Sequence, residues 1–323
     1  MVQGGKRMFG KMMNSYYYGK SGKGDYRKED LPKNRWQLFW EMLRIRFAGL
    51  MRLNLMYAVA WLPVILVTML SVFAMVSGLS QVNEAGEAVL LTGEEARSML
   101  TSLAFGWLLM MIPAITITGP FSAGVSYVTR NWARDEHAFV WSDFKDAVKT
   151  NWKQGLLVSF ITSLMPIILY VCWTFYGGMT AQSPFFVVPQ VLAVMLVVVW
   201  FLAAVYMYPL MVTYKLKFKD LLRNAVLLSV GRLPQSVGLR LLAAVPILIG
   251  AAVVLLSGQV QWAILGLMLY YILIGYSLSR FIYASYTNAV FDRYINSRID
   301  GAAVNRGLSQ EDDDEEDEED DEE

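Results

Sequence analysis

The chain has 323 residues, of which 55% are hydrophobic and 17% are charged, a composition unlike that of ordinary soluble domains and typical of chains that fold in lipid. Its formal net charge is zero, but the 13 residues Glu311–Glu323 are all acidic, so the rest of the chain holds 28 basic and 15 acidic side chains. The single cysteine, Cys172, excludes an internal disulfide and a thiolate metal cluster within one chain.

The chain contains six stretches that are long and apolar enough to cross a bilayer. A helix needs about 20 apolar residues to cross a hydrocarbon core of roughly 30 Å. The six stretches are 55–78, 99–127, 155–177, 186–213, 238–257 and 260–283. The sequence therefore predicts an all-α, polytopic membrane bundle of about six transmembrane helices.

Composition also divides the chain into three regions. Residues 1–33 are rich in Gly, Lys and Tyr without an apolar period, which predicts a disordered basic arm, and residues 34–300 hold the helical domain. Residues 301–323 are predicted to be a disordered acidic tail, because a block of like charge cannot bury a core. Two interpretations of the tail stay open: a solvated appendage, or a polyanion that covers basic surfaces or binds divalent cations.

Basic residues alternate between the connections of the predicted helices. They are frequent before the first stretch, between the second and third, and between the fourth and fifth, whereas the other connections contain only Arg97. Cytoplasmic loops retain Lys and Arg. The pattern predicts that both termini are cytoplasmic.

Three amphipathic segments, 36–47, 141–152 and 215–226, each precede an odd-numbered membrane stretch. Their apolar side chains recur at helical spacing beside a basic stripe, as in helices that lie in the lipid headgroup plane. We expect amphipathic elbow helices at the cytoplasmic surface. They either anchor and orient the spans or mark three repeats of one elbow plus a helical pair.

Seven of the ten prolines lie inside or at the ends of the apolar stretches. Their freed carbonyl groups need partners from neighbouring helices or water. The prolines either shape packed helices or break helices around a substrate site, as in transporters. These residues are Pro63, Pro113, Pro120, Pro166, Pro189, Pro209 and Pro246.

One dense polar constellation follows the second stretch, and together with the start of the next elbow it is the candidate cytoplasmic interaction surface. A lone histidine beside carboxylates is usually a structural hydrogen-bond partner. The alternative is a docking or sensing surface whose arginines pair with carboxylates of a partner or with lipid phosphates. The candidate residues are Arg130, Asn131, Arg134, Glu136, His137, Trp141 and Phe144, and Gly119 and Pro120 are expected to form a helix turn that closes the second stretch.

The predicted spans lack the groups that intramembrane chemistry usually needs. They contain no Asp, Glu or Lys, and Arg240 and Arg280 are expected at cytoplasmic ends, which weighs against a proton-coupled or ion-coupled pump. The sequence also lacks the motifs for nucleotide hydrolysis, zinc proteolysis and a nucleophile elbow. We predict no catalytic, cofactor or metal site. Nucleic acid is not an expected partner, because the basic charges follow membrane topology.

Several motifs carry a family resemblance. The segment TGPFSAG, Thr118–Gly124, is followed by VTRNWARDEHAFVWSDFKDAVKTNWKQ, Val128–Gln154, and the stretch YYYGKSGKGDYRKEDLPKNRW, Asn54 and Pro63 support the match. Over about residues 8–300 the chain resembles the YesL family of bacterial integral membrane proteins, a domain of unknown function. The resemblance implies a multi-pass protein of the bacterial plasma membrane, often encoded beside carbohydrate uptake and glycan degradation systems.

These patterns favour a non-enzymatic accessory or regulatory protein associated with carbohydrate uptake or envelope complexes. Its expected partners are the lipid bilayer and other membrane proteins of such a complex. The alternative is a transporter or channel for an uncharged small solute, and an intramembrane enzyme is the third class. A transporter should contain a polar, water-accessible cavity among its helices, whereas an accessory protein should be closed and present an apolar flank.

Overall fold

The computed structural model describes residues 31–79 and 92–309. The expected N-terminal arm lies almost wholly outside these ranges, and the acidic run Glu311–Glu323 lies wholly outside them. Within the described ranges every regular element is helical. In chain order the elements are α2 (Arg35–Leu79), α3 (Gly93–Trp132), α4 (Val140–Met179), η2 (Pro184–Phe186), α5 (Val187–Thr213), α6 (Phe218–Gly231), α7 (Leu233–Ser257), α8 (Val260–Tyr270), η3 (Tyr271–Gly275), α9 (Tyr276–Tyr294) and η4 (Asn296–Arg298).

Six helical segments are long and apolar enough to cross a membrane, which confirms the predicted fold class and number of spans. They are Arg35–Gly78, Gly93–Trp132, Val140–Met179, Pro184–Thr213, Leu233–Ser257 and Val260–Arg298. The helices extend well beyond the predicted apolar stretches. Because α3 and α4 have 40 residues each, each is about 60 Å long, roughly twice the thickness of the hydrocarbon core.

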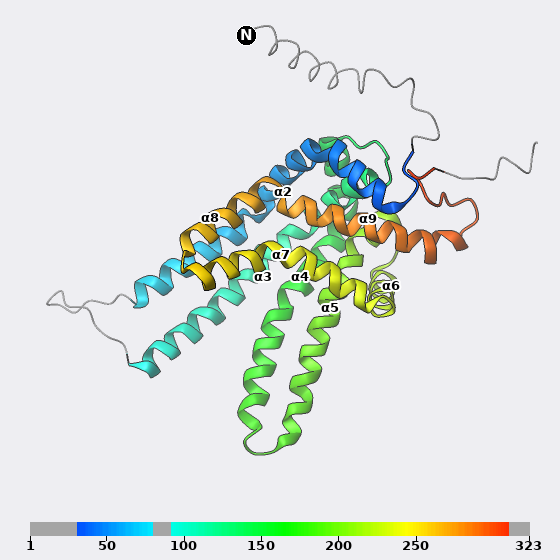
Figure 1. Cartoon of the computed structure of the whole chain (residues 1–323). Coiled ribbons are helices and arrows are strands. Elements are labelled where there is room, and N and C mark those ends of the chain that lie inside the picture. The colour runs from blue at the N-terminus through cyan, green and yellow to red at the C-terminus, as the bar shows by residue number, and fades with distance from the viewer. Residues whose placement is uncertain (1–30, 80–91, 310–323) are drawn as a thin grey trace, which may run out of the picture.

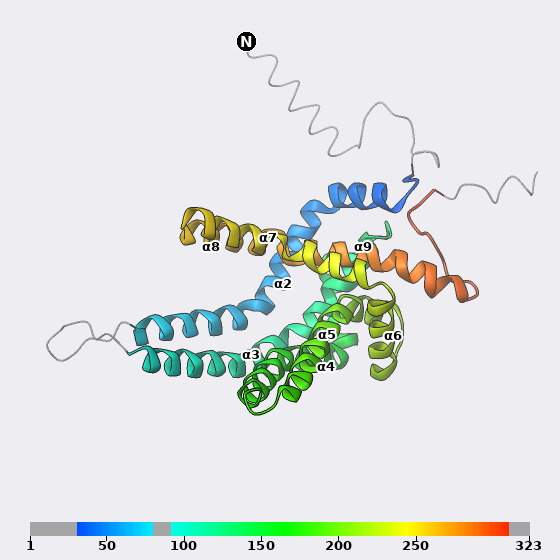
Figure 2. The same cartoon turned by 60° about the horizontal axis from the view of Figure 1, so that its bottom comes forward.

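The three predicted elbows do not form three separate helices. The first is the opening part of α2 and the second is the opening part of α4, each continuous with the span that follows. Only the third is a helix of its own, α6, which ends at Gly231; α7 begins at Leu233, with Pro234 in its first turn. Proline suits the first turn of a helix, where no helical N–H partner is needed. Instead of a break, α2 has bends along its length (Figure 2).

The spans form three hairpins, α2–α3, α4–α5 and α7–α8, whose loop ends diverge from a common packed region (Figure 1; Figure 2). The packed region holds two buried apolar clusters, one centred on α5 and the other on α2 and the second half of α3. Outside it the helices are sparsely covered, and only 6% of the most apolar window of α2 and of α7 is buried. These apolar flanks suit contact with lipid or with other membrane helices.

The motif at residues 118–124 lies inside α3, so the expected turn at Gly119 and Pro120 is wrong. Pro120 lacks the N–H that would bond to the Thr116 carbonyl, and Ser159 Oγ of α4 donates to that carbonyl at 2.6 Å instead. The two helices meet here backbone to backbone at Gly119 and Gly155, with the small Ser159 side chain beside the contact. A Cβ atom on Gly119 would lie 2.1 Å from the Gly155 carbonyl oxygen. The motif therefore builds a helix crossing.

A π-helical turn, η3, joins α8 to α9, and Asn54 of α2 fastens it. Asn54 Nδ2 donates to the carbonyls of Tyr271 and Ile272 at 2.8 and 2.7 Å, and Asn54 Oδ1 accepts from the Ser277 N–H at 2.9 Å. Asn54 is fully buried. A single buried amide thus bonds to three backbone groups in and next to the π-helical turn.

Candidate functional site

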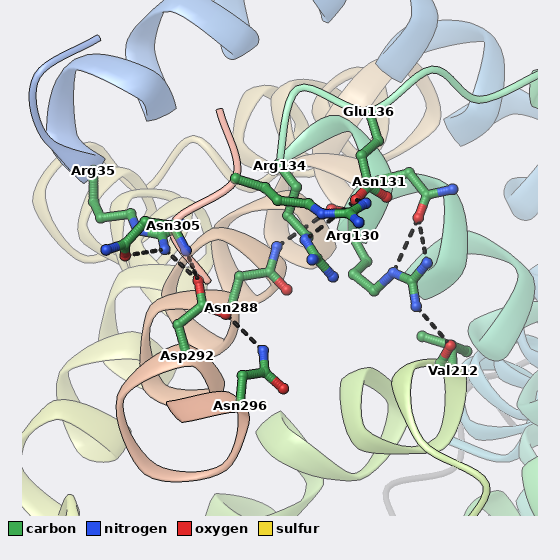
Figure 3. A network of polar contacts seen from close by, with 11 residues as sticks. Arg35, Arg130, Asn131, Arg134, Glu136, Val212, Asn288, Asp292, Asn296 and Asn305 are labelled. Carbon is green, nitrogen blue, oxygen red and sulfur yellow. Dashed lines mark hydrogen bonds and ion pairs between the residues drawn. The ribbon is translucent and has the colours of Figure 1, made fainter. Parts of the chain in front are cut away.

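A polar network joins the start of α2 and the ends of α3, α5 and α9 to the segment that follows α9 (Figure 3). We call it the polar hub. Its members are Arg35, Arg130, Asn131, Arg134, Glu136, Asn288, Asp292, Asn296, Asn305 and Arg306.

One half of the polar hub ties the two ends of the described chain together. Arg35 forms an ion pair with Asp292 and donates to Asn305 Oδ1 at 3.0 Å. The Asp292 carboxylate also accepts from Asn296 Nδ2 at 2.6 Å and from the Asn305 N–H at 3.2 Å. Because Asp292 is only 5% exposed, these donors compensate a charge that burial would otherwise penalise.

Next to the Arg35–Asp292 ion pair, the Tyr214 hydroxyl donates a hydrogen bond to Asn296 Oδ1 at 2.7 Å. Burial raises the pKa of Tyr214 to about 12, and the nearby Asp292 carboxylate acts in the same direction. The phenol therefore remains a neutral donor at physiological pH.

The other half of the polar hub fixes the connection between α3 and α4. Arg130 Nη1 donates to the Val212 carbonyl at 2.9 Å and Arg130 Nε donates to Asn131 Oδ1 at 3.0 Å. Glu136 lies 3.5 Å from Arg134 Nε and 2.5 Å from Arg306 Nη1. Four of the seven predicted surface residues are thus engaged within the chain, as expected for structural partners rather than for free docking groups.

The three remaining predicted residues differ in how exposed they are. Phe144 is 6% exposed and packs against the bare backbone of Gly124. His137 is exposed, and its ring meets that of Phe139 edge-on at 4.6 Å between centroids. Trp141 is 66% exposed. Of the predicted surface, four residues therefore belong to the polar hub, Phe144 belongs to the core, and the rings of His137 and Trp141 are exposed.

Phe139, the residue before α4, was missed from sequence and is also 66% exposed. We call His137, Phe139 and Trp141 the aromatic face. Three rings within five residues, 137–141, were the available signal in the sequence. Exposed aromatic side chains of this kind are enriched at protein interfaces.

A groove of about 270 Å³ lies between α2 and α3, in the hairpin arm away from the polar hub. Its walls are almost wholly apolar, which suits a lipid chain or an apolar side chain rather than a sugar. It is lined by Thr68, Ser71, Val72, Met75, Leu100, Leu103, Ala104 and Trp107. Across residues 31–79 and 92–309, no group of three or more His, Cys, Asp or Glu side chains is placed to hold a metal ion.

Residues 99–173 match a family model. Its description is "Protein of unknown function, DUF624", and the match covers most of α3, the connection with Arg130 and Glu136, and most of α4. The chain is therefore similar to this family over the crossing of Gly119 with Gly155 and over the aromatic face. No curated protein and no solved structure matches the chain.

Proposed function

We propose that this chain is a non-enzymatic accessory or regulatory protein of the bacterial plasma membrane, with both termini in the cytoplasm. It assembles with membrane proteins of a carbohydrate-uptake or envelope complex. The observation that carries the proposal is the aromatic face: Phe139, at the end of the connection, and Trp141, in the first turn of α4, are each 66% exposed, next to a connection that ion pairs and hydrogen bonds hold in place. A rigid surface loses little conformational entropy when a partner binds.

The sparsely covered spans support the same function. Large apolar side chains along α2, α5 and α7 are exposed, which leaves flanks for packing against helices of a partner. The groove between α2 and α3 is apolar, whereas a carrier for an uncharged polar solute needs a polar, water-accessible path. The link to carbohydrate uptake comes from the YesL-type resemblance, and the match to a family of unknown function is compatible with it.

The test is purification of the tagged, full-length chain from native membranes in a gentle detergent, with mass spectrometry of the proteins that accompany it. We expect membrane subunits of an uptake or envelope complex. A double variant, Phe139→Ala with Trp141→Ala, should reduce their recovery about tenfold, because buried aromatic anchors dominate interface energies.

The matched control is Trp262→Ala, since Trp262 is 64% exposed on α8, far from the aromatic face along the chain. This variant should retain the partners. Recovery of the chain alone, together with solute flux through the purified chain in liposomes, would contradict an accessory role. Equal loss of partners in the control would contradict the aromatic face as the contact.

A further inference from the structure

Two arginines, one from α7 and one from α9, lie near each other inside the packed region. Arg280 of α9 lies over the Tyr208 ring, 4.7 Å from its centroid, and interacts with the Tyr57 hydroxyl. Arg240 of α7 lies over the Tyr283 ring at 5.6 Å. Arg280 and Tyr283 are three residues apart on α9 and so share one face of that helix, which brings Arg240 near Arg280. We call these five residues the Arg–Tyr site.

Both arginines lie within the helices that carry them, and the expectation that they lie at cytoplasmic ends of spans stays a prediction. Arg280 precedes Asn288 of the polar hub by eight residues, which is about 12 Å along α9. Arg240 lies within α7 and donates through Nε to the Phe201 carbonyl of α5 at 2.8 Å. The Arg–Tyr site therefore lies about 12 Å along α9 from Asn288 of the polar hub, and its residues come from α2, α5, α7 and α9.

The charges of this site are not balanced by the part of the chain that the structure describes. Within residues 31–79 and 92–309, the ion pairs involve neither Arg240 nor Arg280. Aromatic faces and a carbonyl oxygen attract a cation but carry no formal charge. Two like charges removed from water are costly unless a counter-charge accompanies them.

The residues around the two arginines carry neutral hydroxyl groups, which bond to one another and to backbone carbonyls. Tyr57 and Ser122 share a hydrogen bond of 2.6 Å between their hydroxyl oxygens. The Tyr208 hydroxyl interacts with Ser122 and with Ser159, and both serines are at most 3% exposed. Two planar guanidinium forks match a ligand with several charged oxygen acceptors. Part of the surface of Arg240 and of Arg280 stays exposed, so neither side chain is fully enclosed.

We propose that Arg240 and Arg280 together bind a phosphate-class oxyanion, with their guanidinium N–H groups as the donors. The phosphate belongs either to an anionic lipid headgroup or to a free phosphate, and both present the same oxygen atoms. Bound there, the anion fastens α7 to α5 and α9. The proposal stands independently of the accessory role.

The experiment uses the delipidated full-length chain in an uncharged detergent and follows thermal unfolding by tryptophan fluorescence. One series adds phosphatidylglycerol, with phosphatidylcholine as the uncharged lipid. The other adds inorganic phosphate at constant ionic strength, with chloride as the reference anion. We expect a saturable rise in Tm, and native mass spectrometry should detect one bound anion per chain. A rise with phosphatidylglycerol alone identifies a headgroup site, and a rise with both probes identifies a free-anion site.

Arg240→Gln and Arg280→Gln should each weaken the apparent affinity about tenfold, the usual effect of one charge-assisted hydrogen bond. Arg44→Gln is the matched control, because Arg44 is exposed at the start of α2 and senses anionic lipid only through its charge. If the glutamine variants fail to fold, Arg280→Lys keeps the charge but loses the planar fork, and should bind more weakly than wild type. No saturable response to either probe, or wild-type affinity in the arginine variants, would overturn the proposal.

Discussion

At the scale of single residues, polar side chains complete the hydrogen bonds of backbone groups that helices cannot satisfy alone. Asn54 serves the π-helical turn, and Ser159 serves the Thr116 carbonyl that Pro120 leaves free. Gln154 Nε2 donates to the Leu216 carbonyl in the connection after α5 at 2.7 Å. In lipid these groups have no water as an alternative partner, so each side chain stabilises its site more than an exposed bond would.

Asn54→Ala should lower the free energy of unfolding by about 2–4 kcal/mol, because three buried backbone groups lose their partner at once. Reversible unfolding of the detergent-solubilised chain measures this change. Asn224→Ala is the control, since Asn224 Nδ2 bonds only to the Asp220 carbonyl on an exposed part of α6, and its loss should stay within about 0.5 kcal/mol. Similar losses for both variants would show that Asn54 has no special role.

At the scale of elements, the prolines shape helices without breaking them. Six of the seven prolines of the apolar stretches lie inside continuous helices: Pro63, Pro113, Pro120, Pro166, Pro209 and Pro246. The irregular turn within a span, η3, contains no proline. This favours packed helices over broken transporter helices. The three-repeat hypothesis for the elbows stays a prediction, and the separate α6 shows that the third unit differs from the others.

The crossing of α3 and α4 depends on bare backbone at Gly119. Gly119→Ala should lower the free energy of unfolding by about 2–4 kcal/mol, since the added methyl group would meet the Gly155 backbone and force the helices apart. Gly106→Ala on the same helix meets nothing within 4 Å and should be neutral or slightly stabilising. Thermal unfolding of both variants tests the difference. An equal Tm for the two would contradict a tight crossing at Gly119.

At the scale of the whole molecule, the hairpins diverge while the polar hub holds one end together (Figure 1). The two ends of the described chain meet there: Arg35 pairs with Asp292, and the Ser309 N–H donates to the Pro32 carbonyl at 3.1 Å. The acidic tail would therefore begin beside the polar hub, and its covering of basic surfaces stays a prediction. Divergent hairpins leave large apolar flanks to lipid or to a partner, as the proposed accessory role requires.

Arg35→Ala should destabilise the chain by about 3 kcal/mol, because it leaves the buried Asp292 carboxylate without its cation. Limited proteolysis should then cleave the segment after α9 faster. Combining Arg35→Ala with Asp292→Asn should recover at least about 1 kcal/mol, since the neutral amide no longer needs a counter-charge. Additive losses in this double-mutant cycle would show that the two residues are not coupled.

The sequence alone determined the class of the fold and the number and approximate positions of its six spans. Hydropathy is a local property, and lipid as the solvent demands about 20 apolar residues in each crossing helix. It also placed Arg130, Asn131, Arg134 and Glu136 in one cluster, because they lie within seven residues of each other along the chain.

Only the tertiary structure decided which distant residues meet and which side chains stay exposed. Arg35 and Asp292 are 257 residues apart, and no local pattern indicates their pairing. Gly119 and Pro120 are typical of a turn in water, but a neighbouring helix supplies the missing hydrogen bond and keeps α3 continuous. Arg240 and Arg280 come together because α7 and α9 pack around Tyr283. Such contacts depend on the packing of several helices, which the hydropathy of each helix does not specify.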